Sequence, residues 1–278
     1  MRLIKPSVEI IKQEEYDLNH IFKFIELAGR TCYKSEDKIT EDSAKEFVDR
    51  MIKSGHGAML EHGTVYLTIP NKNISRSLLI YYCERNPYSK VVWTDTNVYI
   101  TTNYRVIIEN NWYDHLEYIT TPTEFHVRRT TVKFICDRAI ANEFVRHRVF
   151  SFAQESTRYC NYTKDKFNNE LTFIIPCWIK DLKEGNYYAY CEYHNSKNDA
   201  SKRWFDSCMS AEFGYTNLIE EGWKPQEART ILPNSLKTEL IMTGFDSDWR
   251  HFFELRCATN AHPQAKELAD MLKDKFNK

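Results

Sequence analysis

Apolar side chains recur at helical spacing in several parts of the chain. Between Ser43 and Ser54 they fall on one face of a helix, which Gly55 is expected to end and a capping box of Ser43 with Glu46 to begin. The same spacing, with proline and glycine marking helix ends, predicts further helices. They cover 138–148, 200–221, 225–232, 235–243, 247–258 and a stretch from about 262 to the C-terminus. Asp137 is the expected N-cap of the helix over 138–148, which contains Ile140, Phe144 and His147 at helical intervals.

Strand patterns are fewer. Thr64 to Ile69 alternates, with Val65, Leu67 and Ile69 on one side, and Pro70 is expected to end this strand. Residues 128–137 predict a second strand, and residues 96–111 one or two more with turns. We interpret 71–125 as an excursion from the core and 161–198, rich in tyrosine and asparagine, as irregular. The prediction is one α+β domain over 1–278, with helices packed on a modest, mostly antiparallel sheet.

Composition narrows the function classes. The chain has 278 residues, 42% of them hydrophobic, and its 38 basic and 39 acidic residues leave a net charge of -1. A general nucleic-acid binder is usually more basic, so any anion binding must be local. No apolar run is long enough for a membrane span, and the charged start does not read as a secretory leader. The eight cysteines contain no C-x-x-C pair, so we expect reduced thiols, no zinc knuckle and a cytoplasmic protein, in the host cytoplasm if it is viral.

The candidate chemistry lies in residues 146–158. Arg146, His147 and Arg148 are consecutive, and a group of polar residues follows: Ser151, Gln154, Glu155, Ser156 and Arg158. Because no glycine-rich phosphate loop occurs in the sequence, a phosphorylated ligand would be held by side chains. Arginine binds phosphate and carbonyl oxygens through a planar fork, and histidine can donate to or protonate an anionic ring. The pattern fits a nucleotide, although a solvated basic helix end remains the alternative.

Residues 146–156 resemble the signature of the flavin-dependent thymidylate synthases, the ThyX family, in which R-H-R is followed by seven residues and a serine. Other stretches resemble the family in the same order: RTCY at 30–33, GHGAMLEH at 55–62, STRYCNY at 156–162, EARTILP at 227–233 and WRHFFELR at 249–256. The resemblance covers most of the chain except 71–125, which we expect to be an insertion that some members carry.

The resemblance implies an α+β subunit in a homotetramer with active sites at subunit junctions. It implies reductive methylation of dUMP to dTMP, with 5,10-methylenetetrahydrofolate as carbon donor, NADPH as reductant and FAD as cofactor. No covalent enzyme nucleophile, no metal, no nucleic acid and no membrane partner are expected.

Site roles are carried over by position. The expected catalytic residues are Arg146, Ser156 and Arg256. The expected flavin contacts are His56, Glu61, Arg146, His147, Arg148 and His251. The expected dUMP contacts are Glu143, Gln154, Ser156, Arg158, Arg229 and Arg256. Ser156 is interpreted as a ligand-binding hydroxyl, because no residue nearby in the sequence is clearly its base. Five departures from the family pattern put individual flavin contacts in question: Cys32, Ala58, Ala153, Phe245 and Asn260.

Two other function classes compete with this interpretation. A non-catalytic nucleotide- or RNA-binding module would use the basic cluster and exposed aromatic rings, but the near-neutral charge argues against it. A histidine-dependent metal hydrolase is weaker, because the sequence has no H-E-x-x-H or comparable pair. The sequence leaves open whether 71–125 covers the active site, extends an interface or binds a partner. It also leaves the proton acceptor at uracil C5 open.

Overall fold

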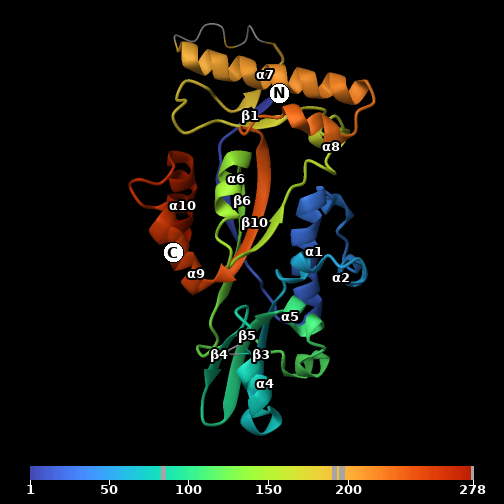
Figure 1. The fold of residues 1–278 in the computed structure, drawn as a ribbon, viewed down its shortest axis with the longest axis vertical. Helices are drawn as coiled ribbons and strands as arrows, with labels where there is room; N and C mark the ends of the chain where they lie inside the picture. The colour runs from blue at the N-terminus through green and yellow to red at the C-terminus, as the bar shows by residue number, and fades with distance from the viewer. Residues whose placement is uncertain (83–85, 190–192, 194–197, 277–278) are drawn as a thin grey trace.

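A four-stranded antiparallel sheet runs through the middle of the molecule (Figure 1). The computed structural model describes residues 1–278 except 83–85, 190–192, 194–197 and 277–278. The strand order is β2-β6-β10-β7, with β2 at Ser7–Ile11, β6 at Arg129–Asp137, β7 at Ser151–Gln154 and β10 at Lys237–Phe245. The strand predicted over 128–137 is therefore confirmed as β6.

β10 corrects the helix predicted over 235–243. It pairs with β6 along its whole length, from Lys237 opposite Asp137 to Phe245 opposite Arg129, and with β7 over four residues. Leu240 and Ile241 are both buried, although they point to opposite faces of the sheet. A strand covered on both faces loses the polar alternation that marks a half-exposed strand. Its Leu, Met, Lys and Glu residues favour helices locally, and the pairing on both edges overrides that preference.

Helices cover both faces of this sheet. One face packs against α6 (Arg138–Phe144), α9 (Asp246–Arg256) and α10 (Pro263–Phe276), in a core that contains Phe134, Leu240 and Trp249. The other packs against α1 (Leu18–Tyr33), through a small cluster of Ala28, Ala153 and Ile241. Next to α1 lie α2 (Ser43–Lys53) and α3 (Gly57–Leu60). The helices predicted over 43–54 and 247–258 and near the C-terminus are confirmed.

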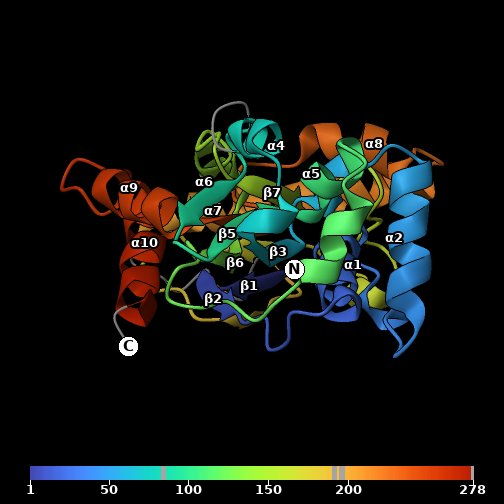
Figure 2. The same cartoon turned by 90° about the horizontal axis from the view of Figure 1, so that it is seen from below.

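Residues 71–125 are part of a core, so interpreting them as an excursion from it was wrong. The predicted strand β3 (Thr64–Pro70) pairs along its whole length with β5 (Asn97–Asn103), and β4 (Lys90–Trp93) completes the sheet. Buried residues of this sheet share one hydrophobic cluster with α1 and α2. The remaining elements are η2 (Asn71–Asn73), α4 (Arg76–Ile80), α5 (Tyr104–Glu109) and η4 (Tyr113–Tyr118). Tyr104 of α5 packs against Phe22 of α1, and α5 also contacts α3; in Figure 2 α5 lies on the α1 side of the molecule.

A third sheet lies at the opposite end of the molecule, beneath α7 (Figure 1). Its order is β8-β1-β9, with β1 at Arg2–Ile4, β8 at Thr172–Ile174 and β9 at Gly185–Asn186. The parallel pair of β1 and β8 makes it a mixed sheet, and it shows that 161–198 is not wholly irregular. The predicted helix over 200–221 is α7 (Asp199–Glu220), and 225–232 forms α8 (Pro225–Ala228) with η7 (Arg229–Ile231). The short η1 (Glu36–Lys38) and η5 (Asp165–Phe167) lie in loops.

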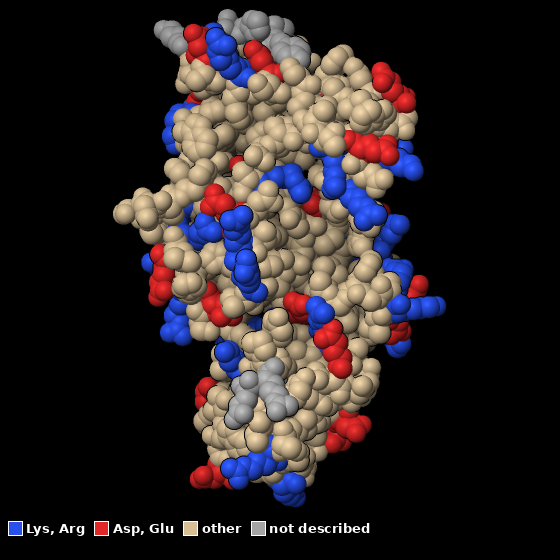
Figure 3. All heavy atoms as spheres, viewed as in Figure 1, with Lys and Arg blue, Asp and Glu red and all other residues tan. Residues whose placement is uncertain are grey.

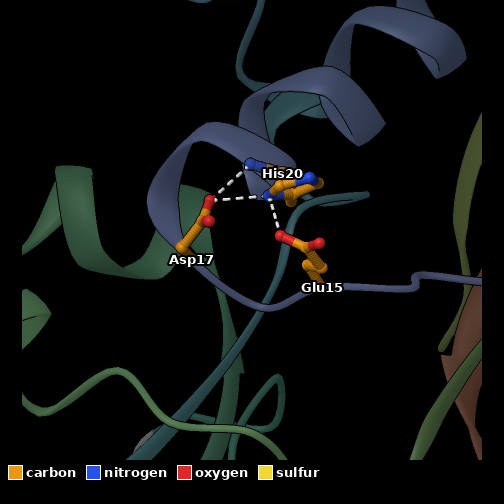
Figure 4. A group of neighbouring side chains, drawn as sticks. All are labelled: Glu15, Asp17 and His20. Atoms are coloured by element: carbon orange, nitrogen blue, oxygen red, sulfur yellow. Dashed lines mark hydrogen bonds and ion pairs between the residues drawn. The ribbon is translucent and has the colours of Figure 1, made fainter.

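The helix N-termini differ from the sequence prediction at one place. Ser43 does not form a capping box, because its hydroxyl donates to Glu26 Oε2 at 2.8 Å and so ties α2 to α1. At α1, Asp17 accepts the His20 N–H at 2.9 Å, and the His20 ring lies between Asp17 and Glu15 (Figure 4). This group is partly exposed, and its contacts account for a helix cap with local charge pairing.

Three further features of the described residues are their helix hydropathy, their cysteines and their surface charge. None of the described helices has the length and apolar composition needed to cross a bilayer. Cys32, Cys136, Cys160, Cys177, Cys208 and Cys257 are free thiols, whereas Cys83 and Cys191 lie outside the described residues. Basic and acidic side chains are interspersed over the face in Figure 3, so local arrangement must supply any anion site.

The central core gives a stability prediction. Phe134 is fully buried between α6 and α9, whereas Phe213 on α7 is 66% exposed. Phe134→Ala should lower the free energy of unfolding by about 3–5 kcal/mol, because it removes buried surface and leaves a cavity. Phe213→Ala, the matched control, should change the unfolding free energy by less than ~0.5 kcal/mol. Urea unfolding monitored by circular dichroism measures both, and equal losses would contradict this account of the core.

Candidate functional site

The R-H-R motif lies in a turn after α6 and not on the helix itself. Asp137 caps α6 as predicted, since its carboxylate accepts the Ile140 N–H at 2.8 Å. The helix ends at Phe144, and the next turn is closed by hydrogen bonds from the N–H of His147 to Phe144 and from the N–H of Phe150 to His147. His147 is therefore buried, while Arg146 and Arg148 are exposed.

Arg256 of α9 joins Glu143 and His147 into one cluster. Its Nη1 donates to Glu143 Oε2 at 2.6 Å and its Nη2 to the Glu143 carbonyl at 2.9 Å. Its Nε donates to His147 Nε2 at 2.9 Å. Because Nε2 accepts this bond, the neutral ring carries its proton on Nδ1. Three of the predicted site residues are thus brought together by direct contacts.

His147 is held in the neutral form. Burial lowers its pKa to about 4, and the positive charge of Arg256 adds to the effect. At neutral pH the ring can donate a hydrogen bond from Nδ1, but it is not an imidazolium that could protonate a ligand. This narrows the two roles that the sequence analysis left open for His147 to hydrogen-bond donation.

A second group of predicted residues follows β7. The Ser156 N–H donates to the Cys32 carbonyl at 2.9 Å, which ties this loop to the end of α1. Arg229 Nη1 donates to Thr157 Oγ1 at 3.3 Å, and the Arg158 N–H donates to Ser156 Oγ at 3.3 Å. The Arg158 guanidinium is exposed and lies over the Tyr159 ring. The Gln154 side chain of β7 makes a long contact with Thr238, 3.4 Å between Nε2 and Oγ1.

A buried charge network supports this loop, and the sequence analysis missed it. Lys237 Nζ contacts Glu155 Oε2 at 2.7 Å and Glu239 Oε1 at 2.6 Å, and Lys34 contacts the same Glu239 oxygen at 2.9 Å. Tyr162 donates its hydroxyl to Glu155 Oε1 at 2.9 Å. The lysines hold the pKa of Glu239 well below its usual range despite burial. The sequence signal for this network was the spacing of Lys237 and Glu239, which lie two residues apart and so share one face of a strand. That signal could be read only after 237–245 was recognised as a strand.

The two groups lie at opposite ends of β7. Arg146 to Arg148 precede this strand and Ser156 to Arg158 follow it. The four residues of β7 alone separate its ends by about 10 Å at ~3.3 Å per residue. Figure 1 shows the same separation for the helices, with α8 near one end of β10 and α9 at the other. The two groups of predicted arginines therefore start from opposite ends of this short strand.

A third group surrounds the turn at 56–62. Glu61 Oε1 accepts a bond from Arg105 Nη1 of α5 at 2.7 Å, and the Glu61 carbonyl accepts one from Arg129 Nη1 at 3.1 Å. His56 is exposed on this turn. Sequence reasoning missed Arg105 and Arg129, because both are distant in sequence and carry no motif.

Two further histidines are placed differently by the structure. His62 is fully buried, its Nδ1 lies 2.8 Å from Thr243 Oγ1, and burial lowers its pKa to about 3. His251 is exposed on α9, with Nδ1 at 3.5 Å from Glu254. Predicted as a flavin contact, His251 makes no contact in this chain with Arg146, His147 or Arg148 at the distances of a hydrogen bond or ion pair.

The two buried histidines predict a pH dependence of stability. Their folded-state pKa values, about 4 and about 3, lie below the ordinary value of 6.5, so the unfolded chain binds more protons in between. Their contribution is fully present above pH ~6.5 and is lost as the pH falls towards 4, by up to ~1.4 kcal/mol per pH unit for each group. Urea unfolding of His147→Gln should show a shallower fall between pH 6.5 and 4.5 than the parent chain, with exposed His56→Gln as control. Parallel curves for all three proteins would contradict the assignment.

Sequence comparison with known proteins shows the family of the chain. The profile described as "Thymidylate synthase complementing protein" matches residues 108–278, more than half of the chain. A protein of Pyrococcus furiosus named "Flavin-dependent thymidylate synthase" is 29% identical over 202 residues, which span 70% of this chain and 75% of the relative. Proteins with the same name from Corynebacterium aurimucosum and Geobacter sulfurreducens are 22% identical over 252 residues and 30% identical over 133. These matches cover 88% and 48% of this chain, and 71% and 49% of the relatives, so about half the length of the Geobacter protein is spanned. The chain belongs to the flavin-dependent thymidylate synthase family, as the R-H-R motif and the segments around it predicted.

Proposed function

We propose that this protein catalyses the reductive methylation of dUMP to dTMP, with methylenetetrahydrofolate as carbon donor and NADPH as reductant of a bound FAD. The observation that carries the proposal is the pair of cationic groups flanking β7 in a chain of this family. Arg146, Arg148 and Arg158 are exposed, and among the described residues none of them is paired with an acid. Unpaired guanidinium groups of this kind suit anionic ligands.

The loop after β7 is the proposed nucleotide side. Arg158 and Arg229 would bind the dUMP phosphate, each charge-assisted hydrogen bond contributing about 1.5–3 kcal/mol. Ser156 and Gln154 would supply neutral donors to the same ligand. The Glu155–Lys237 ion pair and the bond from Ser156 N–H to Cys32 fix the loop backbone, so less ordering is needed on binding.

The R-H-R turn is the proposed flavin side. Arg146, His147 and Arg148 would hold FAD, and His56, Glu61 and His251 would border it. The arginines and histidines of this set are donors that fit a diphosphate and a reduced ring that is anionic near N1, and FAD, when bound, supplies the hydride. Arg256 keeps the His147 ring oriented, and Glu143 in turn holds Arg256. Because the Glu143 carboxylate is bound to Arg256, it would contact the nucleotide next to Arg256 or act on it through Arg256.

The chain's thiols support a mechanism without a covalent enzyme intermediate. Burial raises the pKa of Cys32 to about 11 and those of Cys160 and Cys208 to about 12, so these thiols stay protonated at neutral pH. Ser156 Oγ accepts the Arg158 N–H and contacts neither a histidine nor an acid of the described chain. Activation of uracil C5 would then come from an arginine, Arg146 or Arg256, that polarises a ring carbonyl, together with positioning.

The proposed active site needs cationic groups from more than one copy of the chain. Because the two cationic groups sit at opposite ends of β7, a site that needs both is completed most simply by two copies of the chain, and we propose a homotetramer. The interfaces would then bring the R-H-R turn of one subunit to the Ser156–Arg158 loop of another. We also propose that the protein is located in the cytoplasm.

The nucleotide side can be tested by substitution. Arg158→Ala should lower FAD-dependent tritium release from C5-labelled dUMP by about 10- to 150-fold, since it removes a charge-assisted contact of about 1.5–3 kcal/mol to the phosphate. Flavin content, read from visible absorbance, should be retained. Arg203→Ala, an exposed arginine of α7, is the matched control and should leave release unchanged. A wild-type protein that binds neither FAD nor dUMP would refute the proposed function.

Shared sites can be tested by mixing variants. Arg148→Ala and Arg158→Ala homotetramers should each be nearly inactive. Tetramers reassembled from equal amounts of both should recover about a quarter of wild-type activity, because that fraction of junctions receives an intact turn from one chain and an intact loop from another. Tritium release after refolding the mixture measures this. If mass spectrometry shows hybrid tetramers but activity does not recover, one subunit must supply both groups to each site.

A further inference from the structure

Segment 71–125 reaches the flavin side of the proposed site through the start of α5. β5 pairs with β3 along its whole length, and the N–H of Tyr104, the first residue of α5, donates to the Gly63 carbonyl at 2.9 Å. Asn103 caps the same helix with its side chain. The first turn of α5 is therefore fixed to the chain that follows the 56–61 turn, and Arg105 is the second residue of that helix.

The Arg105 guanidinium holds the Glu61 carboxylate and lies against the backbone of Gly57. Its Nη1 donates to Glu61 Oε1 at 2.7 Å, and its Nε donates to Glu109 Oε1 at 2.7 Å. A Cβ added at Gly57 would come within 3.0 Å of Arg105 Nε, so the missing side chain there makes room for the arginine. Glu61 Oε2 has no hydrogen-bond partner among the described residues. Arg105 thus fixes one carboxylate oxygen and leaves the other as a free acceptor.

A second contact brings the same segment to the start of α9. Lys90 of β4 places its Nζ 5.5 Å from the centre of the Phe245 ring, which is within the range of a cation–π contact. Phe245 directly precedes α9, the helix that carries His251, and it is one of the five departures from the family pattern. Because the two contacts come from α5 and from β4, the segment touches both the 56–61 turn and the start of α9.

We propose that Arg105 is a positioning residue of the flavin side, which holds Glu61 so that Oε2 can accept a hydrogen bond from the flavin nucleotide. The Arg105 side chain is 38% exposed and that of Glu61 19%, so water screens the pair only in part. Without Arg105, the carboxylate would turn freely and would place an unbalanced negative charge beside a ring that becomes anionic on reduction. This inference deepens the proposed function and rests on it for the placement of FAD near Glu61.

The first measurement needs no bound flavin. Arg105→Ala is compared with wild type and with Arg76→Ala, a matched control at an exposed arginine of α4 in the same segment. Amide hydrogen exchange of flavin-free protein, followed by mass spectrometry, should be faster over 56–63 in Arg105→Ala, because the turn loses its side-chain anchor. Exchange over 56–63 should be unchanged in Arg76→Ala. Equal exchange in all three proteins overturns the proposal.

The second measurement is the affinity for FAD, read from flavin fluorescence. Arg105→Ala should raise the Kd about tenfold, the lower end for a charge-assisted hydrogen bond, because Arg105 acts through Glu61. Arg105→Lys keeps a charge within reach of Glu61 and should lose less affinity than Arg105→Ala. Arg76→Ala should match wild type. A wild-type Kd in Arg105→Ala overturns the proposal, as does a loss in Arg105→Lys equal to that in Arg105→Ala.

The reduction potential of the bound flavin distinguishes positioning from a general loss of structure. At saturating FAD, Arg105→Ala should lower this potential, because the unbalanced Glu61 carboxylate opposes the anionic reduced ring. Adding Glu61→Gln removes that charge, so the double variant should return towards the wild-type potential. If the double variant keeps the potential of Arg105→Ala, Arg105 does not act through the Glu61 charge and the proposal is overturned.

Failure of this inference can be told apart from failure of the proposed function. A wild-type protein that binds no FAD refutes the proposed function and, with it, any role of Arg105 towards flavin. If the wild-type protein binds FAD and releases tritium from dUMP, but Arg105→Ala matches it in exchange, affinity and potential, the proposed function stands and the inference about Arg105 fails.

Discussion

The pairing of β10 with β6 on one edge and β7 on the other is the constraint on which the site depends. Because β10 is buried on both faces, its register with both neighbours is fixed by the packing of Leu240 on one side and Ile241 on the other. A slip of one residue would move Lys237 and Glu239 away from Glu155, and Thr243 away from His62. At one end β10 thus fixes the position of the loop after β7. At its other end β10 fixes the position of α9, which carries Arg256.

Buried and half-buried polar groups in this chain differ in how far their charge is compensated by neighbouring side chains. Glu239 contacts Lys34 just after α1, Lys133 of β6 and Lys237 of β10, so its charge is compensated and the network fixes the relation of these elements. Arg256 is likewise satisfied by Glu143 and His147, which suits a residue that orients others. Among the described residues Arg129 donates to neutral oxygens only, and an uncompensated cation contributes less to stability than a paired one would.

The sequence predicted most helices, the strands β3 and β6 and the family, because apolar periodicity and motif spacing are local signals. It failed at β10, where residues with helix propensity are overridden by pairing with strands about a hundred residues away. It failed at 71–125 because the partners of that segment, such as Phe47 and Ile25, lie on helices earlier in the chain. Of the candidate site, the Arg256–Glu143–His147 cluster unites residues that were named individually. Arg105, Arg129 and Lys237 could not be found, since only the fold brings them to the site.

Residues 71–125 contact the turn at 56–61 in this fold. Residues 71–125 supply Arg105, whose guanidinium bridges Glu61 and Glu109 at 2.7 Å each and lies against Gly57, where an added Cβ would come within 3.0 Å of Arg105 Nε. The same segment packs on α1 and α2, so the turn at 56–61 is held between a helix pair and the β3-β5-β4 sheet. Arg105 thereby neutralises Glu61 and leaves Arg129 as the uncompensated charge at this turn. Of the three roles that the sequence left open for 71–125, this contact favours the first, covering the active site, because Glu61 is a predicted site residue and Arg105 makes the segment's one ionic contact with such a residue in the described structure.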